Sequence, residues 1–204
     1  METVDVPRAY DRIAETFFAQ RSVHLRERKY LECALVGLTA GAKVLDFGCG
    51  TGRPIGEYLI ERKFEVVGVD GSVRMLQLAR RTIPTARLIQ ARLEHVELNE
   101  TFAAAIVWDS LFHVDREFHA SVYERLARWI VPGGGLLLTT GGTADAGFTD
   151  QMHGETFYYS SWTPQEVVRL LTIAGFEIEL REMDQPESRG HVVIVARRNR
   201  GPSP

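Results

Sequence analysis

Short apolar runs alternate with amphipathic stretches through the middle of the chain. Runs such as residues 43–47 and 65–69 are largely apolar, which is typical of strands buried on both faces of a sheet. Strands that alternate with helices predict a parallel sheet with right-handed crossovers. The predicted strands cover residues 43–47, 65–69, 86–90, 102–108 and 135–140, and the predicted helices between them cover residues 52–61, 72–81 and 116–130.

The two ends of the chain have patterns of their own. Residues 7–38 predict two helices, with apolar side chains three and four positions apart. Residues 163–174 predict a helix, because the segment opens with TPQE, which has the order of a capping box, and Gly175 follows as a stop. Residues 176–182 and 191–198 predict an antiparallel hairpin.

Residues 141–162 connect the fifth strand to the last helix and show no period. The segment is polar and aromatic, and long irregular connections in compact domains tend to act as lids or binding loops. We therefore expect a substrate lid over residues 143–162, with His153, Tyr158 and Tyr159 in contact with the substrate.

The composition indicates one soluble domain. The 204 residues are 45% hydrophobic and 25% charged, and the net charge of −3 makes nucleic acid an improbable partner. Two cysteines are too few for a disulfide framework, and the opening METVDVPRAYDR is not a signal peptide, so we expect a cytoplasmic protein. No apolar run is long enough to predict a membrane span.

A glycine-rich turn and an acidic residue indicate a nucleoside site. Gly48, Gly50 and Gly52 follow the first strand, where backbone can approach a ligand closely and the next helix can point N–H groups at it. Asp70 ends the second strand, 20 residues after Gly50, where a carboxylate can accept hydrogen bonds from a ribose diol. Arg53 occupies the position where a dinucleotide fingerprint has glycine or alanine, which disfavours a pyrophosphate ligand.

Four segments together resemble the class I S-adenosylmethionine-dependent methyltransferases. They are DFGCGTGR (46–53), VGVDGS (67–72), WDSLFHV (108–114) and PGGGLLLT (132–139). The resemblance implies an α/β fold, a three-layer Rossmann-like sandwich with N-terminal helices. Its seven-stranded, mostly parallel sheet would have the order 3-2-1-4-5-7-6, with the last strand antiparallel.

The resemblance also implies contacts to S-adenosylmethionine, whose product is S-adenosylhomocysteine, and the pattern of elements suggests a division of the chain. We expect a helical cap (1–40), a cofactor-binding core (41–142), the lid, a C-terminal helix and hairpin (163–198) and a tail (199–204). Arg92 stands where the family has an acid for the adenine, and Glu94 could supply it instead. The expected cofactor contacts are Tyr10, Asp46, Gly48, Gly50, Gly52, Asp70, Gly71, Met75, Leu93, Trp108 and Asp109.

His113 is the leading catalytic candidate, because it follows the fourth strand at the carboxyl edge of the sheet. The alternative is that it orients the loop. Methyl transfer from a sulfonium depends mainly on alignment, and a base is needed only if the acceptor arrives protonated. His191 opens an apolar strand and is expected to be structural.

Motifs that the chain lacks limit the classes of methyl acceptor that it is expected to use. The chain has no Asn/Asp-Pro-Pro-Tyr tetrad after the fourth strand, no cysteine there, and no acid cluster with metal-ligand spacing, so we expect no metal. A small-molecule acceptor remains. A nucleotide-dependent oxidoreductase and a catalytically silent module that binds the cofactor stay open as alternatives, and the oligomeric state is not predicted.

Overall fold

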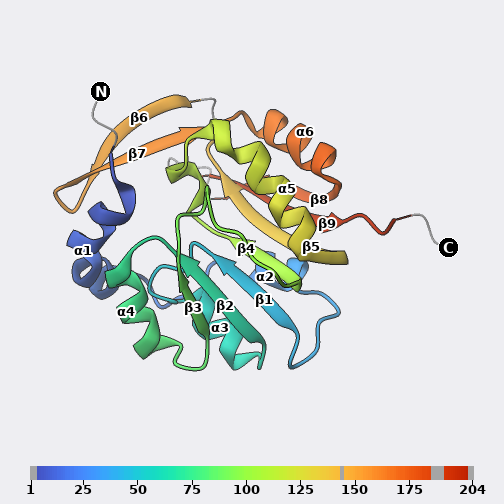
Figure 1. Ribbon diagram of the computed structural model, residues 1–204, viewed down its shortest axis with the longest axis horizontal. Helices are drawn as coiled ribbons and strands as arrows, with labels where there is room; N and C mark the ends of the chain where they lie inside the picture. The colour runs from blue at the N-terminus through green and yellow to red at the C-terminus, as the bar shows by residue number, and fades with distance from the viewer. Residues whose placement is uncertain (1–3, 143–144, 185–190, 202–204) are drawn as a thin grey trace.

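The computed structural model describes residues 4–142, 145–184 and 191–201. Its main sheet is built from β1 (Lys43–Phe47), β2 (Glu65–Asp70), β3 (Arg87–Gln90), β4 (Phe102–Val107), β5 (Ile130–Thr140), β8 (Phe176–Met183) and β9 (Val192–Arg198). The order is β3-β2-β1-β4-β5-β9-β8 (Figure 1). The strands from β3 to β5 are parallel, and β9 is antiparallel to β5 and to β8. The predicted order 3-2-1-4-5-7-6 is confirmed, because β8 and β9 are the sixth and seventh strands of this sheet.

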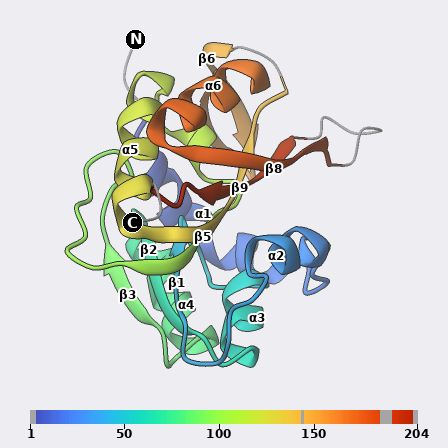
Figure 2. The ribbon, with the colours of Figure 1, turned by 90° about the vertical axis from the view of Figure 1, so that its right-hand side faces the viewer.

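Helices cover both faces of the sheet, which makes three layers (Figure 2). The described α-helices are α1 (Val6–Gln20), α2 (Arg28–Ala34), α3 (Ile55–Glu61), α4 (Val73–Thr82), α5 (His119–Trp129) and α6 (Pro164–Ala174). One hydrophobic cluster joins the sheet to α5 and α6, and another joins it to α2 and α3. Leu45 packs in the first cluster and Val44 in the second, since neighbouring strand residues face opposite sides.

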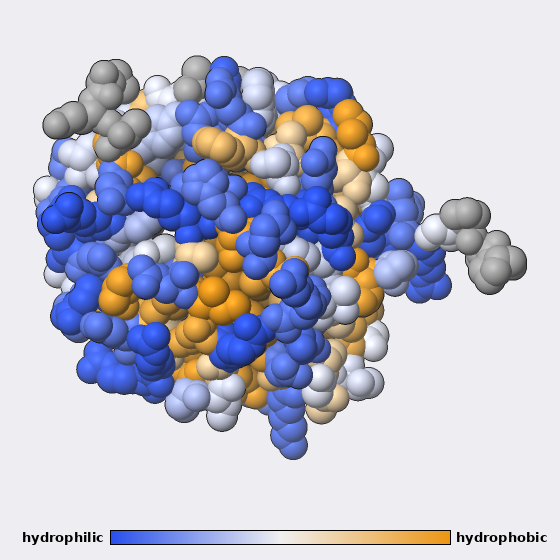
Figure 3. Space-filling view, in the orientation of Figure 1, coloured by the Kyte–Doolittle hydropathy of each residue, from blue (hydrophilic) through white to orange (hydrophobic). Residues whose placement is uncertain are grey.

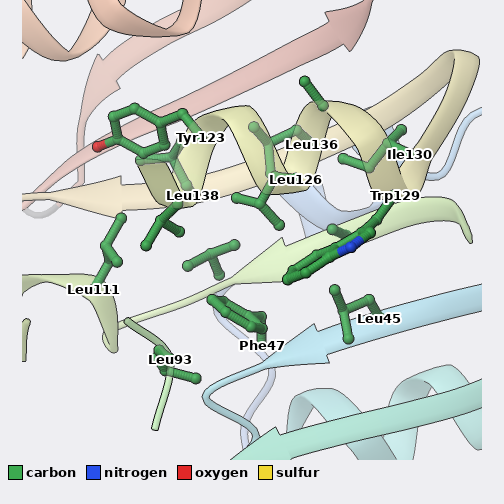
Figure 4. Packing of buried hydrophobic residues seen from close by; sticks show 14 of the residues in the cluster. Leu45, Phe47, Leu93, Leu111, Tyr123, Leu126, Trp129, Ile130, Leu136 and Leu138 are labelled. Carbon is green, nitrogen blue, oxygen red and sulfur yellow. The ribbon is translucent and has the colours of Figure 1, made fainter. Parts of the chain in front are cut away.

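The larger cluster fixes the end of β1 against α5. The rings of Phe47 and Trp129 lie 5.9 Å apart, and Figure 4 shows them with Leu126 and Leu138 around them. Full burial of a side chain of this size contributes about 1.5–3 kcal/mol. Phe47 immediately precedes the glycine-rich turn, so this packing holds the start of the turn.

Arg125 of α5 anchors the segment that follows β3. Its guanidinium donates hydrogen bonds to the backbone carbonyls of Val96, Leu93 and Glu94 at 2.8, 3.1 and 2.9 Å. A buried guanidinium needs such partners, because burying an unpaired charge is costly. The bonds hold Leu93 and Glu94 at the carboxyl edge of the sheet.

The segment predicted to be an irregular lid instead contains a second, two-stranded sheet. β6 (Asp145–Met152) and β7 (Glu155–Ser161) pair antiparallel. The turn between them has φ of 51° at His153 and 83° at Gly154, as in a two-residue type I′ turn. The prediction of irregular structure was wrong because β6 reads DAGFTDQM, which is rich in residues that are depleted in strands.

Helix α1 holds this hairpin in place. Phe157 of β7 is buried with Val6 and Ile13 of α1, and Arg12 pairs with Glu155 at 2.6 Å. Figure 1 shows α1 at the left of the main sheet, beside the β6–β7 hairpin. This contact joins two distant parts of the chain, so the local pattern of β6 and β7 does not show it.

Three predicted helices are shorter than their patterns indicated, and the one predicted over 52–61 begins only at Ile55. The second N-terminal helix begins only at Arg28, and Val23, which was predicted to open it, is 63% exposed. The helix predicted over 116–130 opens with a 3₁₀ turn, Arg116–Phe118, capped by the side chain of Asp115. Residues 185–190, which include the predicted turn of the C-terminal hairpin, lie outside the described residues.

Charged residues dominate much of the surface, and hydrophobic side chains show near the centre of the face in Figure 3. Many of the charges are paired; Lys43, for example, lies 3.0 Å from Glu100 and 3.4 Å from Glu65. Exposed pairs contribute about 0–1 kcal/mol, so stability depends mainly on the two hydrophobic clusters. No helix in the described ranges is long and apolar enough to cross a membrane.

Gly135 of β5 allows α2 to approach the sheet. A Cβ at this position would overlap the backbone carbonyl of Ala34, at the end of α2. We expect Gly135→Ala to lower the free energy of unfolding by about 1–3 kcal/mol in urea denaturation, the usual cost of overpacking. Gly201→Ala is the control, since a Cβ there meets no atom within 4 Å. Equal stability of the two variants would contradict this account of the packing.

Candidate functional site

A cavity of about 710 Å³ lies at the carboxyl ends of β1, β2 and β4, with α1 and the hairpin on its other side. Its volume is within the range of about 300–1,000 Å³ that is common for small-molecule sites. The carboxyl edge of an open α/β sheet is where such folds bind ligands. The predicted site residues that line the cavity are Tyr10, Asp46, Gly48, Gly50, Gly52, Asp70, Gly71, Met75, Leu93, Trp108, Asp109, His113, Tyr158 and Tyr159.

His153 is the predicted site residue that lies elsewhere. It occupies the exposed turn between β6 and β7 and is absent from the described cavity lining. A tight turn directs its residues away from the body of the hairpin, and Thr149 and Met152 of β6 line the cavity instead. The expected contact between His153 and the substrate therefore has no support from its position.

The glycine-rich turn adopts a backbone that other residues would strain. Gly48, Gly50 and Gly52 have φ of 91°, 52° and 76°. A Cβ at Gly48 would overlap the side chain of Ser110, whereas the space beside Gly50 is open to at least 4 Å. Thr51 of the same turn is buried and lines the cavity, and its hydroxyl has no hydrogen-bond partner among the described residues. The turn thus offers an open cradle and a polar group that a bound ligand could satisfy.

Asp70 is bonded to the backbone on both sides of the cradle. Its Oδ2 accepts from the Gly50 amide at 2.8 Å, and its Oδ1 accepts from the Ser72 amide at 2.8 Å. Burial raises the pKa of Asp70, while these backbone bonds act in the opposite direction. A carboxylate has about four lone-pair sites, so it can also accept from two hydroxyls of a ribose.

Asp46 is the second buried acid beside the turn. Burial, followed by the nearby charge of Asp70, raises the pKa of Asp46 to about 7. Both protonation states are therefore populated near neutral pH. A cationic ligand nearby would favour the ionised form, because an opposite charge stabilises a carboxylate.

The predicted adenine end of the cavity is lined by Met75, Leu93 and Glu94. Arg92, which replaces the acid that the family has, also lines the cavity and pairs with Asp5 at 2.6 Å and with Glu94 at 3.5 Å. The structure therefore brings Glu94 to the cavity, next to the backbone of Leu93. An exocyclic amino group could donate to this carboxylate.

Tyr10, His113 and Tyr158 form a hydrogen-bond chain in the cavity wall. His113 Nδ1 lies 2.9 Å from the backbone carbonyl of Tyr158, and His113 Nε2 lies 2.9 Å from the Tyr10 hydroxyl. A carbonyl only accepts, so Nδ1 carries the proton and Tyr10 donates to Nε2. Burial lowers the pKa of His113 to about 4, which leaves the ring neutral at pH 7. Both ring nitrogens are thus occupied within the protein.

Asp109 is supported by His191, which was predicted to be structural. Its Oδ1 lies 3.0 Å from His191 Nδ1 and accepts a hydrogen bond from the Thr139 hydroxyl at 3.3 Å. His191 also lies 3.6 Å from Asp184 and packs edge-on against Trp108. His191 therefore helps to position a carboxylate of the cavity wall. The pairing joins segments far apart in the chain, so the sequence carried no signal for it.

Several cavity residues were not predicted. They include Phe17 and Arg21 of the N-terminal region and Phe112 and Asp115 of the segment after β4. Phe112 directly precedes His113 in the quoted motif WDSLFHV (108–114), so its proximity to His113 was a usable signal, whereas Asp115 lies just after the motif. Within the described ranges, no group of three His, Cys, Asp or Glu side chains could hold a metal ion.

The ion pair between His191 and Asp109 predicts a pH-dependent stability. Burial alone would lower the pKa of His191, but the bond to Asp109 and the charge of Asp184 outweigh it and raise the pKa. A raised pKa adds stability that is full below about pH 6.5, the unfolded value, and is lost as pH rises through the folded value. We expect His191→Asn to lower the free energy of unfolding more at pH 5.5 than at pH 8.5, measured by urea denaturation.

The exposed His24 provides the control for this measurement, since it lies outside the cavity lining. His24→Asn should not reproduce the pH dependence. A loss of stability in His191→Asn that is the same at both pH values would show that the ion pair does not stabilise the fold.

Comparison with known proteins agrees with this architecture. Residues 44–134 match the family described as a methyltransferase domain. Trans-aconitate 2-methyltransferase of Methylobacterium nodulans is 37% identical over 103 residues, which are 50% of this chain and 39% of that protein. The chain spans less than two thirds of the length of the first curated relatives it matches.

Solved structures share the fold at low sequence identity. The 1,6-didemethyltoxoflavin-N1-methyltransferase of Burkholderia thailandensis, solved with 1,6-didemethyltoxoflavin and S-adenosylhomocysteine, has a TM-score of 0.72 at 19% identity, covering 95% of this chain and 85% of that one. A putative S-adenosylmethionine-dependent methyltransferase of Listeria monocytogenes has a TM-score of 0.72 at 19% identity, covering 85% and 98%. Residues 44–134 are therefore similar to a methyltransferase domain, and the solved structures share the fold of this chain.

Proposed function

We propose that this protein transfers a methyl group from S-adenosylmethionine to a small-molecule acceptor. The observation that carries the proposal is the buried carboxylate of Asp70, bonded to the amide of Gly50 across an open glycine cradle. That arrangement suits a ribose held close to backbone, and it lies in a cavity with room for a second small ligand.

The cradle residues would hold the cofactor, and the opposite wall would hold the acceptor. When bound, S-adenosylmethionine supplies an activated methyl group on a positively charged sulfur. Asp70 would bind the ribose hydroxyls, Met75 would pack beside the adenine, and Asp46 and Asp109 would place negative charge near the cationic end. The protein's contribution is alignment and the exclusion of water, effects that can be worth about 7–11 kcal/mol.

His113 acts, in this proposal, by positioning Tyr10 rather than as a base. Its Nε2 accepts from the Tyr10 hydroxyl, and its Nδ1 donates to the carbonyl of Tyr158, so neither nitrogen is free for an acceptor. Through this chain it ties α1 to β7 above the cavity. Tyr158 and Tyr159 of β7 then form a wall of the acceptor site, within the region 143–162 expected to be a lid.

The division of the chain into cap (1–40), cofactor-binding core (41–142), lid, C-terminal unit (163–198) and tail is part of the same proposal. Tyr10 lines the cavity from the cap, and Thr139 supports Asp109 from the core. Cytoplasmic location and the absence of nucleic-acid partners stay predictions from composition.

Thermal unfolding tests the cofactor assignment. A ligand at 100 times its dissociation constant stabilises by roughly 2.7 kcal/mol, which for a domain of this size raises the midpoint by roughly 5 to 10 °C. We expect S-adenosylhomocysteine and S-adenosylmethionine to give this shift and NADH to give none.

Asp70→Ala should weaken S-adenosylhomocysteine binding at least tenfold in calorimetry, because bonds to a charged group are worth about 1.5–3 kcal/mol each.

Glu177→Ala, an exposed change on β8, is the control and should bind like the wild type. A shift with NADH alone would favour an oxidoreductase. Binding of the adenosyl ligands without turnover of any acceptor would favour a silent binding module. Unchanged affinity in Asp70→Ala would show that the ribose site is assigned incorrectly.

Kinetics on the pair Tyr10 and His113 test the positioning role. Tyr10→Phe and His113→Ala should each lower kcat/KM about two- to tenfold, the worth of one neutral hydrogen bond, and the double variant should be no worse than His113→Ala. Because the pKa of His113 is lowered to about 4, kcat should show no His113 titration between pH 6 and 9. A loss on the order of 10²–10⁴ in His113→Ala alone would instead identify a general base.

A further inference from the structure

Five rings line the part of the cavity between α1, the segment after β4 and the hairpin. They belong to Tyr10, Phe112, His113, Tyr158 and Tyr159, and we call this part the acceptor end. All five side chains are half-buried. They come from three separate elements, so the fold assembles an aromatic surface that the cradle for the cofactor does not need.

Neighbouring rings at the acceptor end are stacked. Tyr159 lies 5.1 Å from Phe148 at an interplanar angle of 14°, and 5.8 Å from Phe112 at 28°. His113 lies 4.7 Å from Tyr159. Near-parallel stacking is a preferred arrangement of aromatic rings. Phe112 and Tyr159 both line the cavity, so part of this stacked aromatic cluster is apolar surface that a ligand can contact.

The cations around the cavity already face acids. Each lining arginine of the described chain has a carboxylate partner, so a ligand with several carboxylates would have to compete for it. The pairs are Arg21 with Glu27 at 3.7 Å, Arg53 with Glu57 at 3.0 Å and Arg92 with Asp5 at 2.6 Å.

Carboxylates outnumber these cations in the described lining. They are Asp46, Asp70, Glu94, Asp109 and Asp115. Asp115 lies at the acceptor end, where its Oδ2 accepts from the Tyr158 hydroxyl at 3.2 Å and its Oδ1 accepts from the Glu117 amide at 3.0 Å. A negative ligand group placed there would meet a like charge, whereas an uncharged ring with a hydroxyl or N–H would not.

We propose that the methyl acceptor is a planar aromatic or heteroaromatic molecule without negative charge. This inference rests on the proposed function and narrows its substrate class. The inferred acceptor differs from trans-aconitate, the tricarboxylate in the names of two curated relatives. Recognition of three carboxylates requires cations that are not already paired.

Binding of matched probes tests the inference with the full chain saturated with S-adenosylhomocysteine. 2-Naphthol is planar and uncharged at pH 7, 6-hydroxy-2-naphthoate adds one carboxylate to the same ring system, and trans-aconitate has three carboxylates and no ring. We expect calorimetry to give 2-naphthol at least tenfold tighter binding than either anion. Equal or tighter binding of 6-hydroxy-2-naphthoate or trans-aconitate would overturn the inference.

Ring-removal variants locate the binding. Phe112→Leu and Tyr159→Leu keep apolar bulk but remove a stacking face, so each should weaken 2-naphthol at least fivefold. Their affinity for S-adenosylhomocysteine, measured separately, should stay within twofold. Phe64→Leu is the matched control, because Phe64 is buried in the cluster on the other face of the sheet and lies outside the described cavity lining. It should not change 2-naphthol affinity.

The two proposals fail in different ways. If S-adenosylhomocysteine does not bind, the proposed function is wrong, and the substrate inference falls with it. If S-adenosylhomocysteine binds but 2-naphthol does not, or if Phe112→Leu and Tyr159→Leu leave its affinity unchanged, the aromatic acceptor is wrong and the cofactor assignment stands.

Discussion

The hydrogen bond from the Gly50 amide to the Asp70 carboxylate, 2.8 Å long, joins the end of β2 to the turn after β1, and the rest of the site is arranged around it. It requires a backbone with positive φ through the turn, which only glycine adopts without strain. It also requires a buried carboxylate, which is tolerated because two amides bond to it. The bond between Gly50 and Asp70 therefore determines both the shape of the cradle and the position of its negative charge.

Helix α1 connects the two ends of the cavity. Asp11 of α1 accepts from the Ser72 hydroxyl at 2.6 Å, next to Asp70, while Tyr10 reaches across to His113. The same helix packs on Phe157 of the hairpin. Any movement of α1 would therefore affect both the Asp70 end and the aromatic end of the cavity, since one element contacts both.

Acidic residues give the cavity its electrostatic character. Burial, followed by the nearby charge of Asp70, raises the pKa of Asp46 to about 7. The negative charge of Asp109 is instead paired with His191, whose Nδ1 lies 3.0 Å from Asp109 Oδ1. A cavity of this kind favours a cation, and it offers a negatively charged acceptor little compensation.

The sequence by itself determined the parallel sheet, its strand order through the family resemblance, and the cradle with Asp70. These features depend on local periodicity, on glycine spacing and on the convergence of strand ends at one edge of the sheet. All three can be predicted from the amino-acid sequence. Only the tertiary structure decided the β6–β7 hairpin, the support of Asp109 by His191 and the occupied ring nitrogens of His113. Those features depend on contacts between distant segments, and the polar strand β6 has no pattern of its own that predicts them.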